Sequence, residues 1–199
     1  MQALIAITQL TAKNFTTMRI ISGYLKGRKF NPPAKKWPTR PTTDIAKEGL
    51  YNILQNQIDF HTAVFLDLFG GTGNHCYEFI SRGCTDVTYV DKHGPAVGFV
   101  KQMARELDVE DILHIYRDDV FRFIKHATRS YSVIFAGPPY PLRRIPDIPD
   151  LVLEGDLLTP DGLFILEHNE DHHFPHHPNF VEERKYGDTR FSFFTKNAR

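Results

Sequence analysis

The sequence predicts one α/β domain with a mostly parallel, doubly wound sheet, preceded by a small β-hairpin and helix and closed by an antiparallel hairpin. Three observations predict this class. The 199 residues, 41% of them hydrophobic, suffice for one sizeable core. From residue 63 onward, short apolar runs alternate with longer amphipathic stretches, as in parallel sheets. Two strand-like runs near the end are joined by Gly187-Asp188, a hairpin turn signal.

The elements follow in order along the chain. Residues 1–17 form an extension that lacks the basic start and cleavage pattern of a secretory signal. Two short β-type pieces within residues 19–30 predict a hairpin, and residues 44–57 predict a helix capped by Thr43 or Asp44. Strands are then expected at residues 63–69, 87–90, 112–116, 132–136 and 163–166, helices at 74–82, 95–107, 120–127 and 149–155, and the closing hairpin at 180–186 and 190–195. We therefore divide the chain into an extension (1–17), a hairpin and helix (18–60) and a sheet domain (61–199).

Charge is distributed unevenly, although the formal net charge is zero. Residues 1–48 carry nine basic and two acidic side chains, a net charge of +7, so the remainder carries −7. Between residues 18 and 40 there is no acidic residue, and Tyr24, Phe30 and Trp37 are interleaved with the bases. Such a segment suits phosphate contacts and base stacking. A solvated basic hairpin explains the pattern equally well, and for Trp37 a place against the core is slightly favoured.

Composition argues against several other classes. No apolar run approaches the roughly 18 residues that a bilayer crossing requires, so no membrane association is expected. Cys76 and Cys84 cannot form a disulfide framework, which indicates a reduced, cytoplasmic compartment and ordinary packing roles. The histidine-rich stretch 168–177 lacks the regular spacing of metal ligands and contains Pro175, so we expect a solvated loop and no metal.

Residues at the carboxyl ends of the predicted strands indicate a cofactor site, because open α/β sheets bind ligands there. The first strand leads into a glycine loop that lets the backbone turn tightly and approach a ligand. Asp91 follows the second strand, where a carboxylate can accept ribose hydroxyls, and Asp118 and Asp119 follow the third, where one can accept an adenine amino group; helix capping explains such acids about as well. A nicotinamide fingerprint fails at Cys76, where its third glycine should stand. The candidate cofactor-binding residues are Asp67, Phe69, Gly70, Gly71, Thr72, Gly73, Asp91, Lys92, Asp118, Asp119 and Val120.

This constellation resembles the cofactor site of the class I S-adenosylmethionine-dependent methyltransferases, which implies a Rossmann-like sheet and S-adenosylmethionine as cofactor. After the fourth strand, the candidate catalytic residues Gly137, Pro138, Pro139 and Tyr140 resemble the D/N-P-P-Y/F motif of enzymes that methylate exocyclic amino nitrogens of nucleobases. In that chemistry, hydrogen-bond acceptors aimed at the amine localise its lone pair for attack on the sulfonium methyl. The proline pair fixes a carbonyl acceptor, and the tyrosine stacks on the base.

Further stretches are Met18-Arg19-Ile20-Ile21-Ser22-Gly23, Lys26-Gly27-Arg28, Thr39-Arg40-Pro41-Thr42-Thr43-Asp44, Leu50-Tyr51-Asn52-Ile53-Leu54 and the closing Tyr186-Gly187-Asp188-Thr189. Together they resemble the RsmD-type 16S ribosomal RNA guanine-N2 methyltransferases, over nearly the whole chain. The resemblance implies methylation of the exocyclic N2 of a guanine, guanine 966 in the family's usual substrate, on an assembling small ribosomal subunit. It also implies that residues 39–44 cover cofactor and substrate; we expect a monomer. The candidate RNA-binding residues are Arg19, Lys26, Arg28, Lys29, Arg40, Thr42, Arg143 and Arg144.

One position departs from this family. Gly137 stands where Asp or Asn is usual and has no side-chain acceptor, a loss that by analogy with removing one preorganised hydrogen-bond group costs roughly 10²- to 10³-fold in rate. Three explanations stay open: the Pro138 carbonyl and a bound water suffice, the protein is weakly active, or the glycine is a sequence change. Two alternative functions also stay open: a non-catalytic RNA-binding assembly factor, and a DNA adenine-N6 methyltransferase, for which no segment is long enough to form the expected target-recognition domain.

Overall fold

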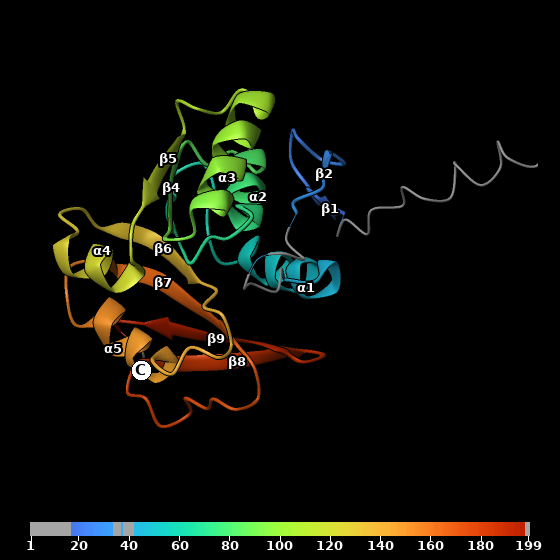
Figure 1. The fold of residues 1–199 in the computed structure, drawn as a ribbon. Helices are drawn as coiled ribbons and strands as arrows, with labels where there is room; N and C mark the ends of the chain where they lie inside the picture. The colour runs from blue at the N-terminus through green and yellow to red at the C-terminus, as the bar shows by residue number, and fades with distance from the viewer. Residues whose placement is uncertain (1–16, 34–36, 38–41, 198–199) are drawn as a thin grey trace, which may run out of the picture.

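The computed structural model describes residues 17–33, 37 and 42–197. A seven-stranded sheet with the order β5-β4-β3-β6-β7-β9-β8 runs through its centre, with helices against both faces (Figure 1). Its strands are β3 (Val64–Leu68), β4 (Asp86–Asp91), β5 (Leu113–Arg117), β6 (Tyr131–Ala136), β7 (Leu158–His168), β8 (Phe180–Tyr186) and β9 (Thr189–Thr195). The helices are α1 (Asp44–Leu54), α2 (Asn74–Ser81), α3 (Gly94–Leu107), α4 (Val120–His126) and α5 (Ile148–Leu153), with the 3₁₀ turn η2 (Ile145–Asp147) before α5.

The strand directions confirm the expected fold class. Strands β3 to β7 are parallel, whereas β9 lies antiparallel beside β7 and pairs in turn with the edge strand β8. A separate antiparallel hairpin of β1 (Met18–Arg19) and β2 (Lys29–Phe30) precedes α1. The protein therefore has a Rossmann-like, mostly parallel sheet with an antiparallel C-terminal hairpin, a small N-terminal hairpin and a helix.

Two expected boundaries differ from the observed ones by three residues or more. The helix expected at residues 44–57 ends at Leu54 and continues as turns. The strand expected at 163–166 begins earlier, at Leu158, because the pairing of β7 with β6 shifts register between Tyr131 and Val133. The residues around Pro160, whose composition is typical of a turn, thus form an irregular part of the strand. At the start of α1, Thr43 is the cap: its hydroxyl accepts a hydrogen bond from the backbone of Ala46 at 3.3 Å.

Two apolar clusters cover the two faces of the sheet. Phe65 and Leu66 are neighbours in β3 but belong to different clusters, because successive strand side chains point to opposite faces. On one face, helices α1, α2 and α3 pack with the N-terminal hairpin, and Phe65 stacks on Phe79 with ring centroids 3.6 Å apart. On the other face, α4 and α5 cover residues that include Phe164. The hairpin shares the first of these clusters through Met18 and Phe30.

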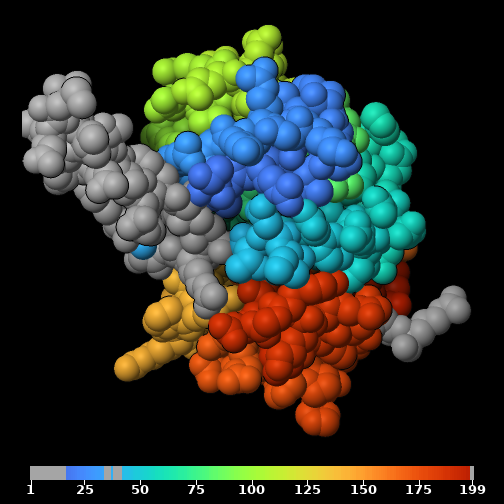
Figure 2. Space-filling model, turned by 90° about the vertical axis from the view of Figure 1, so that its right-hand side faces the viewer, coloured from blue at the N-terminus to red at the C-terminus, as the bar shows by residue number. Residues whose placement is uncertain are grey.

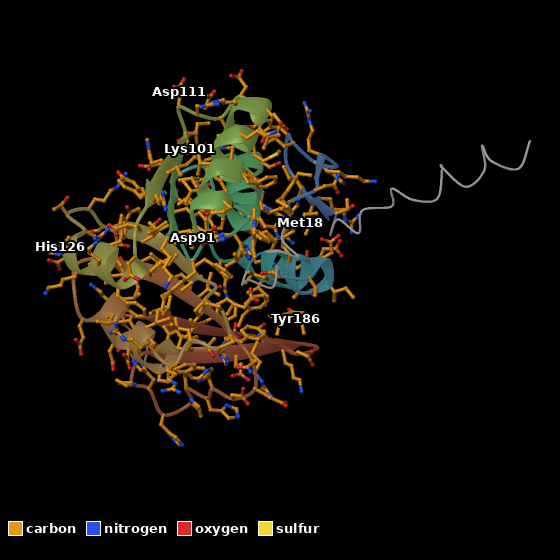
Figure 3. The ribbon with its side chains drawn as sticks, viewed as in Figure 1. Met18, Asp91, Lys101, Asp111, His126 and Tyr186 are labelled. Carbon is orange, nitrogen blue, oxygen red and sulfur yellow. The ribbon has the colours of Figure 1, made fainter. Side chains whose placement is uncertain are left out.

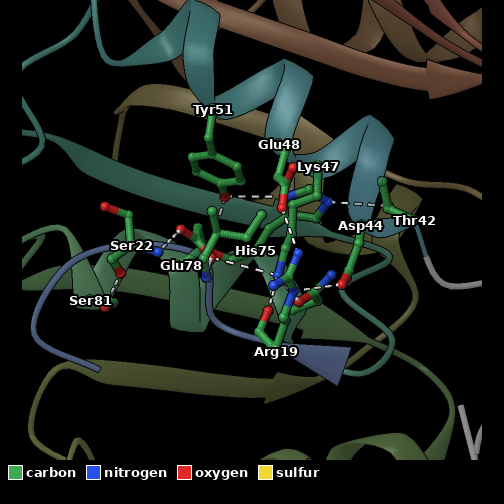
Figure 4. A network of polar contacts seen from close by, with 12 residues as sticks. Arg19, Ser22, Thr42, Asp44, Lys47, Glu48, Tyr51, His75, Glu78 and Ser81 are labelled. Carbon is green, nitrogen blue, oxygen red and sulfur yellow. Dashed lines mark hydrogen bonds and ion pairs between the residues drawn. The ribbon is translucent and has the colours of Figure 1, made fainter. Parts of the chain in front are cut away.

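A buried ion pair joins the hairpin, α1 and α2 (Figure 4). Lys47 and Glu78 are fully buried, with Nζ 3.6 Å from Oε2. Lys47 Nζ also donates to the backbone carbonyl of Arg19 at 2.5 Å and to Oδ1 of Asn74 at 2.8 Å. The Glu78 carboxylate accepts hydrogen bonds from the backbone after β1, including that of Ile21 at 2.8 Å. Because each charge is hydrogen-bonded, the pair fixes the hairpin to the helix that begins at the glycine loop.

The surface shows the same arrangement. In Figure 2 the N-terminal hairpin (blue), α1 (cyan) and the C-terminal strands (red) follow one another across one face of the molecule. Tyr186, at the end of β8, lies close to α1 (Figure 3). A Cβ at Gly49 of α1 would meet the Tyr186 ring at 2.1 Å, so the helix and β8 approach more closely than alanine allows. Among the described helices, none is long and apolar enough to span a bilayer.

Candidate active site

The loop after β3 lines a cavity with its backbone. A Cβ at Gly70 would lie 2.4 Å from the ring of Tyr89, so a side chain has no room there. Gly71 and Gly73 have φ values of 51° and 74°, in the left-handed region that glycine adopts without strain. The Tyr89 hydroxyl donates to the carbonyl of Gly71 at 2.9 Å. Gly73 is the N-cap of α2, so the loop presents a helix N-terminus beside the cavity.

Asp67, in β3, lies in the wall of this cavity and is only 1% exposed. Burial raises its pKa to about 8, although the hydrogen bond from the Cys76 thiol, 3.2 Å from Oδ2, opposes this shift. Without a ligand, Asp67 therefore holds a proton at neutral pH. A cation placed in the cavity would favour the ionised carboxylate, so this residue can respond to a positively charged ligand.

Asp91 ends β4, as expected (Figure 3). Its carboxylate supports the glycine loop. Its Oδ2 accepts a hydrogen bond from the backbone N–H of Gly71 at 2.9 Å, and Oδ1 accepts one from that of His93 at 2.8 Å. A carboxylate has about four lone-pair sites, so these two bonds orient Asp91 and are compatible with further donors. Lys92 is exposed beside it.

Asp118 and Asp119 line neither of the two cavities at the carboxyl ends of the strands. Asp119 caps α4 by accepting hydrogen bonds from the backbone of Phe121 at 3.1 Å and of Arg122 at 3.3 Å. Asp118 accepts from Arg122 Nε at 2.6 Å, and this bond lowers the pKa of Asp118. The capping alternative thus describes Asp119, whereas Asp118 pairs with the Arg122 side chain. Val120 lines the larger cavity.

Two adjoining cavities, of about 210 Å³ and about 370 Å³, lie along the carboxyl ends of the strands. Phe69 and Pro139 line both, so the cavities meet at these residues. The smaller one contains the glycine loop and the motif after β6, and the larger is mostly apolar. Its lining residues are Phe69, Asp91, Lys92, His93, Gly94, Arg117, Val120, Phe121, Pro139 and Leu142.

The residues present fit S-adenosylmethionine. Two buried polar atoms of lining residues, Nδ2 of Asn74 at the smaller cavity and Nδ1 of His93 at the larger, lack a hydrogen-bond partner among the described residues. Such atoms are costly unless a ligand or water satisfies them. An apolar cavity with Asp91 at its edge suits an adenosine, and the cavity beside Asp67 and the loop backbone suits a charged amino-acid group. Trp37 lies beside His93, with ring centroids 5.6 Å apart.

The predicted catalytic motif lies in the smaller cavity, next to the glycine loop. The backbone N–H of Gly137 donates to the carbonyl of Leu68 at 3.1 Å, which joins the end of β6 to the end of β3. Pro138 is buried and Pro139 half-buried. The Tyr140 hydroxyl lies 3.4 Å from both Glu167 Oε1 and Thr189 Oγ1. The motif is therefore held against both β7 and the beginning of β9.

Sequence reasoning missed five residues that line this cavity: Asn74, His75, Phe135, Pro141 and Glu167. Burial lowers the pKa of His75 to about 3, so its ring is neutral, and it lies 3.3 Å from Thr42 Oγ1 and 3.2 Å from the Tyr51 hydroxyl (Figure 4). Glu167 is 5% exposed near the carboxyl end of β7. The rule applied to the first four strands, that their carboxyl ends carry the site, would have found Glu167 after the fifth apolar run.

Some of the candidate RNA-binding residues already contact other side chains of the protein, whereas others are exposed to solvent. Arg19 forms ion pairs with Asp44 at 2.9 Å and with Glu48 at 2.7 Å. Thr42 lines the smaller cavity. Arg144 pairs with Asp147 at 2.9 Å and lies over the ring of Phe121. Arg40 lies outside the described residues. Those that extend into solvent are Lys26, Arg28, Lys29 and Arg143.

The histidine-rich stretch packs partly against the sheet. His168 is fully buried, its Nε2 lies 2.8 Å from the hydroxyl of Ser192, and burial lowers its pKa. Over the described residues, no group of His, Cys, Asp or Glu is arranged to hold a metal ion. The expectation of a solvated loop over residues 168–177 is therefore wrong for His168, which is the last residue of β7 and lies in the core.

The fold, the loop of glycines and the paired cavities define a class I, S-adenosylmethionine-dependent methyltransferase. Residues 18–195 match the family model described as Conserved hypothetical protein 95, and the chain belongs to this family, which confirms the resemblance inferred from sequence. It is 32% identical over 187 residues to the Putative rRNA methyltransferase YlbH of Bacillus subtilis (strain 168), covering 91% of this chain and 100% of the relative. It is 28% identical over 157 residues to the Ribosomal RNA small subunit methyltransferase D of Haemophilus influenzae, covering 77% and 80% of the two chains.

Solved structures agree with the fold. The putative methyltransferase yhhF from Escherichia coli superimposes with a TM-score of 0.78 at 22% identity, covering 92% of this chain and 99% of the other. An RNA methyltransferase from Salinibacter ruber in complex with S-adenosyl-L-homocysteine gives a TM-score of 0.63 at 15% identity, covering 80% and 95%. At these identities, the likeness concerns the fold.

Proposed function

We propose that the protein transfers a methyl group from S-adenosylmethionine to the exocyclic N2 of a guanine in 16S rRNA, of the guanine 966 type, on an assembling small ribosomal subunit. The observation that carries this proposal is the meeting of the glycine loop and the motif Gly137–Tyr140 in one cavity. The names of the two relatives above support rRNA as the substrate. S-adenosylmethionine supplies an electrophilic methyl group at this place.

The residues of the chain have distinct tasks in this proposal. Asp91 and the wall of the larger cavity bind the adenosine, whereas Asp67 and the loop backbone bind the amino-acid end. The carbonyl of Pro138 accepts a hydrogen bond from the target amine, whose lone pair is otherwise delocalised into the base. Tyr140 stacks on the base once it has left its helix or loop.

RNA contact is assigned to the N-terminal hairpin and to the loop after the motif. Lys26, Arg28 and Lys29 are exposed on the hairpin, and Arg143 is exposed three residues after Tyr140. Cationic side chains in these places position RNA through its phosphates and leave base selection to the cavity. We propose that residues 18–60 serve as the RNA-binding segment and residues 61–199 as the methyltransferase domain.

The test is transfer of a labelled methyl group from S-adenosylmethionine to small ribosomal subunits that lack the modification. We expect label on guanine N2 in 16S rRNA. A Gly137→Asp variant belongs in the same assay, because its Cβ would lie 3.2 Å from the Phe135 ring and requires a shift of only a few tenths of an ångström. Absence of both transfer and cofactor binding in the two proteins would contradict the proposal.

Gly137 also motivates a second candidate, a non-catalytic assembly factor that binds RNA on the same fold. This candidate predicts that the parent chain binds cofactor and RNA but transfers no methyl group, whereas Gly137→Asp becomes active. If the protein is instead a DNA adenine-N6 methyltransferase, label will appear in DNA. Duplex DNA is therefore tested as a substrate in the same assay.

A further inference from the structure

A second carboxylate lies beside the position where Gly137 lacks one. In the register of the parallel strands β6 and β7, Ala136 pairs with Leu166. The next residues, Gly137 and Glu167, therefore lie side by side at the carboxyl ends of neighbouring strands. Both line the smaller cavity, together with Pro138 and Tyr140. The side chain of Glu167 on β7 can thus reach the part of the cavity that a side chain at position 137 would occupy.

The Glu167 carboxylate is held in place by residues of the site. Thr42 Oγ1 donates to its Oε2 at 2.5 Å, and the Tyr140 hydroxyl donates to its Oε1 at 3.4 Å. Only 5% of the residue is exposed. A carboxylate accepts about four hydrogen bonds, so one oriented by hydroxyl groups can also accept an N–H of a bound amine. Burial makes such a charge-assisted bond stronger than it is in water.

We infer that Glu167 supplies the side-chain acceptor that Gly137 lacks and is a catalytic residue of the amine methylation; this inference rests on the proposed function. Its carboxylate accepts a hydrogen bond from the exocyclic amine and directs the nitrogen lone pair at the methyl group. The lone pair forms the N–C bond, the C–S bond breaks, and its electron pair stays on sulfur as a neutral thioether. The proton lost from nitrogen passes to Glu167 and from there to water. Thr42 is a positioning residue, because it acts on the amine through Glu167.

The experiment compares Glu167→Gln with the parent chain in steady-state methylation of small ribosomal subunits. Glutamine keeps the size of the side chain but cannot take a proton. We expect kcat to fall roughly 10²-fold, with the Kd of S-adenosylhomocysteine, the KM of the RNA and the Tm close to those of the parent. The matched control is Glu170→Gln, an exposed glutamate three residues further along, which leaves all four quantities unchanged.

The decisive variant combines Glu167→Gln with Gly137→Asp. If position 137 and Glu167 serve the same amine, the new carboxylate raises kcat at least tenfold above that of Glu167→Gln alone. A purely structural role for Glu167 predicts the reverse pattern, in which Tm and cofactor affinity fall together with kcat and Gly137→Asp restores nothing. That pattern, or a Glu167→Gln protein with kcat within threefold of the parent, overturns the inference.

The same assay separates this inference from the proposed function. A parent chain that methylates a different exocyclic amine contradicts the guanine assignment, while the variants still decide the role of Glu167. A parent chain that methylates no nucleobase amine at all overturns both.

Discussion

Asp67 illustrates at the scale of one residue how burial changes the acidity of a carboxyl group. Its pKa of about 8 lies above the ordinary 3.8, so the folded protein keeps a proton that the unfolded chain releases. The carboxyl group therefore lowers stability progressively as the pH rises from about 4 to about 8. The thiol of Cys76 moderates this cost through its hydrogen bond.

We predict that Asp67→Asn removes this pH dependence. The free energy of unfolding of the variant, minus that of the parent, should increase between pH 5 and pH 8 by at least roughly 1 kcal/mol, because one unit of pKa shift corresponds to about 1.4 kcal/mol. Urea denaturation at several pH values measures it. Asp118→Asn is the control: the pKa of Asp118 is lowered, so this side chain stays ionised over that range and its difference should stay flat. A flat difference for Asp67→Asn would contradict the assigned cause.

Individual residues also show where sequence reasoning stops. A carboxylate after a strand is predictable, but what it binds is not: Asp91 holds the glycine loop, whereas Asp119 caps a helix. The choice depends on which backbone N–H groups the tertiary fold brings near. His75 lies just beyond the glycine loop and Glu167 near the end of β7, but their proximity to Thr42 follows from strand register and helix packing.

At the scale of elements, α1 is attached through the buried Lys47–Glu78 pair. We predict that Lys47→Met destabilises the protein by about 3–5 kcal/mol, because it leaves the Glu78 charge buried without its partner. Chemical denaturation measures the loss. Lys101→Met, at an exposed position of α3, should change stability by less than roughly 0.5 kcal/mol. Equal effects of the two substitutions would show that the pair contributes no stability.

The contact between α1 and β8 gives a second prediction. Alanine is favoured over glycine within a helix by about 1 kcal/mol, yet Gly49→Ala should destabilise the protein by roughly 1–3 kcal/mol, because its Cβ would overlap the Tyr186 ring. A double-mutant cycle checks the cause: in a Tyr186→Ala background, Gly49→Ala should be neutral or stabilising. If the effects of Gly49→Ala and Tyr186→Ala on stability are additive, the destabilisation by Gly49→Ala comes from another contact.

At the scale of the whole molecule, the separation of charge between the first 48 residues and the remainder has a measurable consequence. Replacing Lys26, Arg28 and Lys29 together by Gln should weaken RNA binding and reduce the slope of log affinity against log salt by roughly 2–3, with cofactor affinity unchanged. Lys101→Gln/Lys125→Gln, exposed on α3 and α4, should leave that slope unchanged. Equal slopes for the parent and the triple variant would contradict RNA contact by the hairpin.

Element order and sheet class were predictable because they depend on local periodicity, which the sequence carries directly. The glycine loop and the motif Gly137–Tyr140 were predictable because each is contiguous. The remaining features involve residues far apart in the chain: the Lys47–Glu78 pair, the Tyr186 contact of Gly49, and the Thr42–Glu167 bond. No window of sequence contains both members of such a contact, so only the fold reveals them.

The insertion of β9 between β7 and β8 constrains the order of events during synthesis. Thr189, at the start of β9, contacts Tyr140, and β9 pairs with β7 directly beside Glu167. A nascent chain that has emerged only as far as β8 therefore lacks the contact of Thr189 with Tyr140 and the inner partner of its last strand. Translation must therefore pass β9 before the sheet and the support of Tyr140 are complete.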